Sequence, residues 1–166
     1  MKFLSVIREA YTYPKETMYK SLLICSLIFI CAFAQAQSYQ YQYVETLSEN
    51  QSEITFTMNV FCDSKKTFEQ SAYLSGLRCV LFDGIPGSKF SKPLLSEGER
   101  TLMGKHPDYF QELYGWRYAD FLPECRQLTK LKKSGAYKTA LMQMTVKVMN
   151  LRKDLEKNNI KTKLGI

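Results

Sequence analysis

Two stretches in the first half of the sequence alternate between apolar and polar residues. Residues 40–47 read QYQYVETL, and residues 54–61 read ITFTMNVF. Alternation is the pattern of a strand with one buried face, because successive side chains of a strand point to opposite faces of the sheet. The link between them, residues 48–52, is short and polar. The pattern therefore predicts two strands joined as an antiparallel hairpin.

Helical spacing replaces alternation in residues 65–81. Small residues share one side of this predicted helix and leucines widen its apolar stripe, so we expect it to lie close against a sheet. Either Asp63 or Ser64 is suited to cap its start. A second, shorter helix is predicted to begin at Pro107, whose fixed backbone angle suits a first turn, and to end near Gly115.

The last part of the sequence predicts one more strand and one more helix. Residues 136–149 alternate again, and residues 150–157 have helical spacing with Asn150 as the candidate N-cap. Residues 82–104 carry Asp-Gly, Pro-Gly and Lys-Pro pairs without a sustained period, which predicts a long loop whose role in binding stays open. The order of elements predicts an α+β domain, a small antiparallel sheet with helices packed on one face.

An apolar segment precedes this domain. Residues 21–34 are an uncharged run of 14 residues, whereas a membrane-spanning helix needs about 20. Lys20 lies directly before the run, and an Ala-Gln-Ala sequence ends at Ala36. A basic flank, a short apolar run and small residues in this order predict a signal-peptide helix in residues 1–36, cleaved after Ala36. The alternative is a buried core helix, and translation from Met18 would give a more compact signal.

Cleavage there leaves residues 37–166 as a single α+β domain that begins at Gln37. We expect this domain to be exported and to be periplasmic or associated with the cell envelope, without a stable transmembrane anchor. Its size is sufficient for a hydrophobic core without a metal or a dense set of disulfides.

Few residues are suited to catalysis or metal binding. His106 is the one histidine of the sequence, and no G-x-S-x-G motif surrounds a serine. The cysteines of the domain, Cys62, Cys79 and Cys125, show no metal or redox spacing. They form either one disulfide with one thiol left over or three buried thiols that act as small hydrophobic groups. We therefore expect a non-enzymatic protein without a cofactor or metal, with an enzyme using His106 as the third hypothesis.

Charge is concentrated near the C-terminus. The chain has 23 Lys and Arg against 16 Asp and Glu, and ten of the basic residues lie in residues 130–166. The second hypothesis is therefore binding of anionic glycan or lipid head groups, and the alternative is that these lysines form a solvated strand edge and helix face. The export signal and the lack of an RNA-binding motif argue against nucleic acid. The candidate anion-binding residues are Lys130, Lys132, Lys133, Lys147, Arg152 and Lys153.

Aromatic residues crowd into residues 109–121. Such a cluster forms either core or an interface, because tyrosine and tryptophan are enriched where proteins bind each other. The candidate partner-binding residues are Tyr109, Phe110, Tyr114, Trp116 and Tyr118. The first hypothesis is accordingly a scaffold or accessory protein that binds another envelope component. The sequence specifies neither that partner nor the oligomeric state.

Four short runs carry a resemblance. They are LFDGIPG at residues 81–87, KPL at 92–94, His106 with the Tyr-Phe pair at 109–110, and LRKDLE at 151–156. Over about residues 54 to 160, the chain resembles uncharacterised small exported proteins of Bacteroidetes-type bacteria. More remotely, it is similar to the accessory domains of envelope and flagellar assembly proteins. The resemblance implies an envelope location, an α+β fold and a scaffold role, and it assigns no function to any residue.

Overall fold

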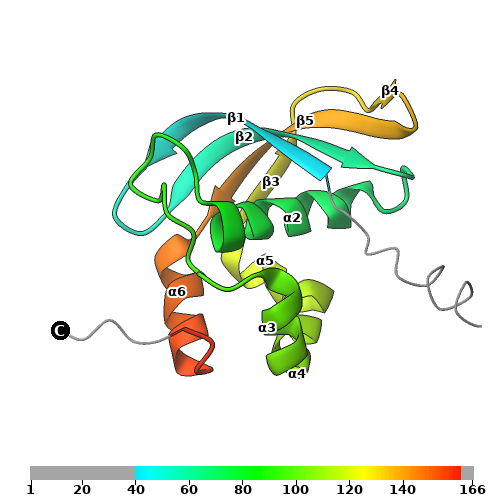
Figure 1. Cartoon of the computed structure of the whole chain (residues 1–166). Helices are drawn as coiled ribbons and strands as arrows, with labels where there is room; N and C mark the ends of the chain where they lie inside the picture. The colour runs from blue at the N-terminus through cyan, green and yellow to red at the C-terminus, as the bar shows by residue number, and fades with distance from the viewer. Residues whose placement is uncertain (1–39, 162–166) are drawn as a thin grey trace, which may run out of the picture. The chain divides into compact units, whose positions relative to one another are not determined.

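A computed structural model describes residues 40–161 of the chain (Figure 1). All of them belong to one unit, Tyr39–Ile166. The predicted signal peptide, residues 1–36, lies outside the described residues. Within residues 40–161, no helix has the length and apolar character needed to cross a membrane.

Five antiparallel strands form one sheet. In chain order they are β1 (Gln40–Glu49), β2 (Ile54–Cys62), β3 (Glu124–Gln127), β4 (Lys132–Ser134) and β5 (Tyr137–Val146). The spatial order is β1-β2-β5-β3, and β4 pairs with the other end of β5. The small antiparallel sheet that the alternation predicts is thus confirmed.

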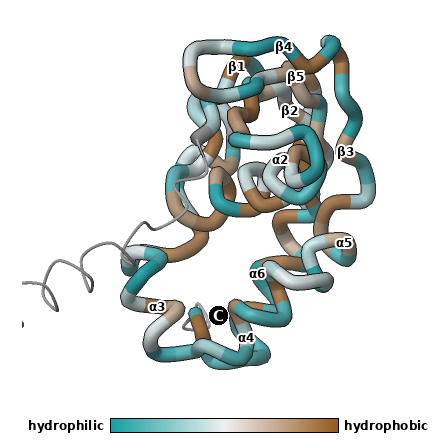
Figure 2. Tube along the Cα trace, turned by 90° about the vertical axis from the view of Figure 1, so that its right-hand side faces the viewer, coloured by the Kyte–Doolittle hydropathy of each residue, from teal (hydrophilic) through white to brown (hydrophobic). Residues whose placement is uncertain are grey.

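One face of the sheet carries most of the hydrophobic core. Phe56 of β2 lies opposite Met144 of β5, and both side chains are fully buried. The helix α2 (Phe68–Arg78) packs on this face (Figure 2). A β-carbon at Gly76 would lie 2.6 Å from the sulfur of Met144, so the absence of a side chain there allows the close approach. The expectation that small residues let this helix lie against the sheet is confirmed.

The remaining helical elements lie beyond α2 on the same side of the sheet. They are the π-helical turn η1 (Cys79–Asp83), α3 (Glu99–Lys105), α4 (Pro107–Glu112), a second π-helical turn η2 (Leu113–Arg117), α5 (Tyr118–Phe121) and α6 (Val148–Lys157). Figure 1 shows α2 between the sheet and helices α3 and α4, whereas α6 begins directly at the end of β5, where the amide of Met149 donates to the carbonyl of Ser52 in the β1–β2 link. The packing of helices on one face is therefore as predicted.

Three details of the sequence prediction are corrected. Lys147 is the N-cap of α6 and Val148 its first residue, so the predicted strand 136–149 is too long and Asn150 lies inside the helix. Val148 is buried as the first residue of the helix, and it would also be buried as a strand residue. The alternating pattern therefore continues past the last residue of the strand and does not mark where the strand ends. Thr67, and neither Asp63 nor Ser64, is the N-cap of α2. Helix α3 lies inside the predicted loop 82–104.

Candidate functional site

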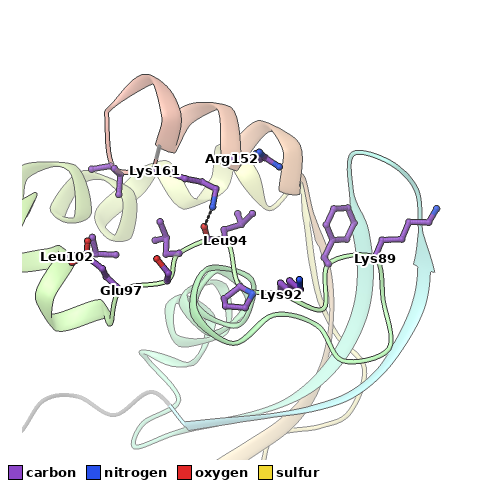
Figure 3. A pocket seen from close by; sticks show the side chains of 12 residues that line it. Lys89, Lys92, Leu94, Glu97, Leu102, Arg152 and Lys161 are labelled. Atoms are coloured by element: carbon purple, nitrogen blue, oxygen red, sulfur yellow. Dashed lines mark hydrogen bonds between the residues drawn. The ribbon is translucent and has the colours of Figure 1, made fainter. Parts of the chain in front are cut away.

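A hollow of about 540 Å³ lies between the segment that follows η1 and the C-terminal end of α6 (Figure 3). We call it the basic cleft. Residues 89–90, residues 92–97 and Leu102 line one side, and Arg152, Ile160 and Lys161 line the other. A volume of this size is within the range of sites that hold small molecules.

Backbone hydrogen bonds fix the cleft segment against η1. The amide of Gly84 donates to the carbonyl of Cys79 over 2.7 Å, and Gly84 has a φ of 76°, which turns the chain out of the helix. The segment then returns, and the amides of Leu94 and Leu95 donate to the carbonyls of Val80 and Leu81. The lining residues are thus held on a fixed backbone.

The same segment is also attached to the edge strand β1. The hydroxyl of Tyr41 donates a hydrogen bond to the carboxylate of Asp83. Burial and this hydrogen bond to a carboxylate raise the pKa of Tyr41. The backbone amide of Lys89 donates to a carboxylate oxygen of Glu49 over 2.9 Å. The two ends of β1 therefore hold the two sides of the turn that leads into the cleft.

Positive charge dominates the lining of the cleft. Its cations are Lys89, Lys92, Arg152 and Lys161, and its one lining carboxylate belongs to Glu97. Glu97 accepts a hydrogen bond from Lys105 over 2.6 Å, and Arg152 is paired with Glu156 over 2.9 Å. The ammonium groups of Lys89, Lys92 and Lys161 have no carboxylate within 4.0 Å among residues 40–161. The cleft therefore attracts anions.

The remaining lining is largely apolar. Leu95 and Leu102 are almost fully buried, and Phe90, Leu94 and Ile160 are partly buried. In Figure 3, Lys161 reaches across to the carbonyl of Leu94, to which it donates a hydrogen bond, while Lys89 extends away at the rim. A cationic rim over apolar side chains suits a ligand that combines an anionic group with an apolar part.

The structure separates the predicted anion-binding residues. Arg152 lines the basic cleft, whereas Lys153 lines a second hollow of about 370 Å³ together with Arg117 and Asp154. Lys147 begins α6. Lys130, Lys132 and Lys133 lie in or next to β4, at the opposite end of the molecule in Figure 1. The six residues therefore do not form one surface.

Most of the predicted aromatic site serves internal packing. Phe110 is fully buried, with its ring centroid 5.4 Å from that of Tyr109 and 5.6 Å from that of Tyr114. The rings of Tyr118 and Tyr73 lie 4.9 Å apart.

Tyr109 also belongs to a polar network. Its hydroxyl donates to Asp154 over 2.8 Å, and Asp154 accepts a second hydrogen bond from Arg117 over 2.7 Å. Trp116, by contrast, is 64% exposed. A protein partner that binds Trp116 stays a hypothesis.

All three cysteines of the domain are free. Cys62 and Cys79 are buried and Cys125 is partly buried. Burial raises the pKa of the Cys79 and Cys125 thiols to about 12. Since the thiolate is the reactive form, these groups are poor nucleophiles at neutral pH.

His106 lies at the junction of α3 and α4, where it ends one helix and caps the next. No group of three or more His, Cys, Asp or Glu side chains that could hold a metal ion occurs within residues 40–161.

Sequence reasoning missed Lys89, Lys92 and Lys161 as site residues. The first two lie in the loop whose binding role was left open, and the third follows the last predicted helix. No local signal indicates that these segments meet. Comparison of the chain with protein-family models, with curated proteins and with solved structures finds no match.

Proposed function

We propose that the chain is an exported, non-enzymatic binding protein of the cell envelope that holds an anionic, partly apolar envelope component in the basic cleft. The observation that carries the proposal is the set of four cations around an apolar floor. An anionic head group would neutralise Lys92 and Lys161, which have no carboxylate partner among the described residues. The attached apolar part would cover Leu94, Leu95 and Leu102.

The two halves of this ligand contribute differently. A hydrogen bond to a charged group is worth about 1.5 to 3 kcal/mol, so the anionic group provides specificity. Burying apolar surface contributes about 25 cal/mol per Å² and provides affinity that depends little on salt. A ligand lacking either half should therefore bind more weakly.

Titration calorimetry with octyl phosphate tests the proposal. We expect binding to the parent protein, and weaker binding of octyl glucoside, which has the same apolar chain without a charge. Lys92→Ala and Lys161→Ala should each lower the affinity for octyl phosphate about tenfold, the loss of one charge-assisted hydrogen bond. Lys157→Ala removes a lysine of α6 that lies outside the cleft, and it should change the affinity for octyl phosphate less than twofold. Equal losses in all three variants would refute the cleft as the binding site.

The envelope location rests on the predicted signal peptide. We expect the exported product to begin at Gln37, because the apolar run and the Ala-Gln-Ala sequence direct cleavage after Ala36. N-terminal sequencing of the product from a periplasmic or envelope fraction checks this. Recovery of a full-length chain from the cytosol would contradict it and would make nucleic acid a partner to test again.

A further inference from the structure

The fold brings two groups of lysines to one end of the sheet. Lys65 and Lys66 follow β2, whose last residue, Cys62, pairs with Lys138 of β5. The short strand β4 pairs with the same end of β5. We call the resulting group the lysine tip; its members are Lys65, Lys66, Lys130, Lys132, Lys133 and Lys138. More than sixty residues of sequence separate its two halves.

The lysine tip places like charges against each other. Lys133 lies directly opposite Lys138 in the β4–β5 ladder, and like charges at such positions destabilise a sheet. Among residues 40–161, no carboxylate lies within 4.0 Å of an ammonium group of the tip. The arrangement is thus unfavourable for the isolated domain and becomes favourable when an external anion neutralises it.

The tip is convex. A two-residue turn, Gly135 and Ala136, joins β4 to β5, and Gly135 has a φ of 61°, as tight hairpin turns require. Figure 1 shows the end of this hairpin away from helices α3 to α6. Lys132 pairs with Thr139 and therefore lies on the face opposite α2, whereas Lys133 lies on the α2 side. Positive charge consequently surrounds the hairpin instead of lining a groove.

We propose that the lysine tip docks the protein onto the surface of an anionic lipid bilayer. A hairpin end with lysines on both faces fits a flat surface whose anionic lipids can gather around it. A single-stranded nucleic acid would instead need a charged groove with aromatic stacking platforms. Among the described residues, the most exposed aromatic side chain is Trp116, which belongs to the helical layer, and Tyr137 of the hairpin is half-buried. The inference does not depend on the ligand of the basic cleft.

Vesicle sedimentation of residues 37–166, the exported product that we expect, tests the docking without the apolar run of residues 21–34. We expect binding to vesicles of equal parts phosphatidylglycerol and phosphatidylcholine, weaker binding to phosphatidylcholine alone, and release at about 0.5 M salt, where charges are strongly screened. A lysine near an anionic membrane contributes about 1 kcal/mol, so the double variant Lys132→Gln and Lys133→Gln should bind more than tenfold more weakly. Lys153→Gln with Lys157→Gln removes the same charge from α6 and should change binding less than twofold.

A second double variant distinguishes the loss of positive charge from a disturbance of the β4–β5 hairpin. Lys65 and Lys66 lie outside the sheet, and the double variant Lys65→Gln with Lys66→Gln should also weaken vesicle binding more than tenfold. Lys92→Ala, in the basic cleft, should leave it unchanged. Equal losses in the tip and control variants would overturn the proposal. A competition with single-stranded DNA gives a second test. If the DNA displaces the protein from the vesicles at a phosphate concentration below that of the vesicle lipids, the tip prefers nucleic acid and the proposal is also overturned.

Discussion

Replacing Gly84 with alanine is expected to destabilise the domain by about 3 kcal/mol or more. Gly84 has a φ of 76° and a ψ of 167°, a backbone region that is essentially restricted to glycine and costs other residues about 1 to 3 kcal/mol. A β-carbon there would also lie 2.7 Å from the carbonyl carbon of Ser91 and closer still to its oxygen. This neighbour is backbone and cannot rotate away, so overpacking adds about 1 to 3 kcal/mol. Urea unfolding measures the difference in free energy of unfolding.

Gly87→Ala is the matched control. Gly87 has a φ of 73°, but a β-carbon there would meet no atom within 4 Å. Gly87→Ala should therefore lower the free energy of unfolding by about 1 to 2 kcal/mol, which is the cost of the backbone conformation alone. Because the Gly84 turn also starts the segment that carries Lys89 and Lys92, folded Gly84→Ala should bind octyl phosphate more weakly than Gly87→Ala. Equal destabilisation of the two variants would show that the Ser91 backbone moves aside at little cost.

The sheet and its helices were predictable where burial leaves a periodic pattern. The core positions of β2 and β5 alternate with polar positions, because these central strands bury one face. Strands β3 and β4 were missed, since β3 is almost wholly exposed and β4 entirely so, and neither has an apolar face to reveal it. Helix α3 was missed for a similar reason, because Leu102 is its one buried residue.

The candidate site depends on tertiary contacts that no local pattern encodes. The basic cleft forms because η1 ends at Gly84 and its following segment folds back toward α6, where it meets Arg152 and Lys161. The concentration of charge near the C-terminus was visible in the sequence, but the fold divides it between the cleft, α6 and the lysine tip. The aromatic cluster likewise allowed either core or interface; the fold buries Phe110 and packs Tyr109, Tyr114 and Tyr118 against the core, and it leaves Trp116 exposed.

Alkaline pH is expected to unfold the domain, with stability falling from about pH 9. Burial raises the pKa of Cys79 and Cys125 from 9.0 in the unfolded chain to about 12 in the folded one. It also raises the pKa of Tyr41, Tyr109 and Tyr114 above their unfolded value of 10.0. Between the unfolded and folded pKa the unfolded chain has lost protons that the folded chain retains, so stability falls as pH rises.

The slope identifies the groups responsible. Each such group contributes up to about 1.4 kcal/mol per pH unit, and the two thiols act from about pH 9, before the three phenols begin at about pH 10. Urea unfolding at pH 8, 9, 10 and 11 should therefore give a curve that steepens with pH and reverses on return to pH 8. Cys79→Ala removes one titrating thiol and should make the fall shallower between pH 9 and 10, even though the cavity lowers stability at pH 8. A stability that stays constant from pH 8 to 11 would mean that water reaches these thiols and phenols in the folded state.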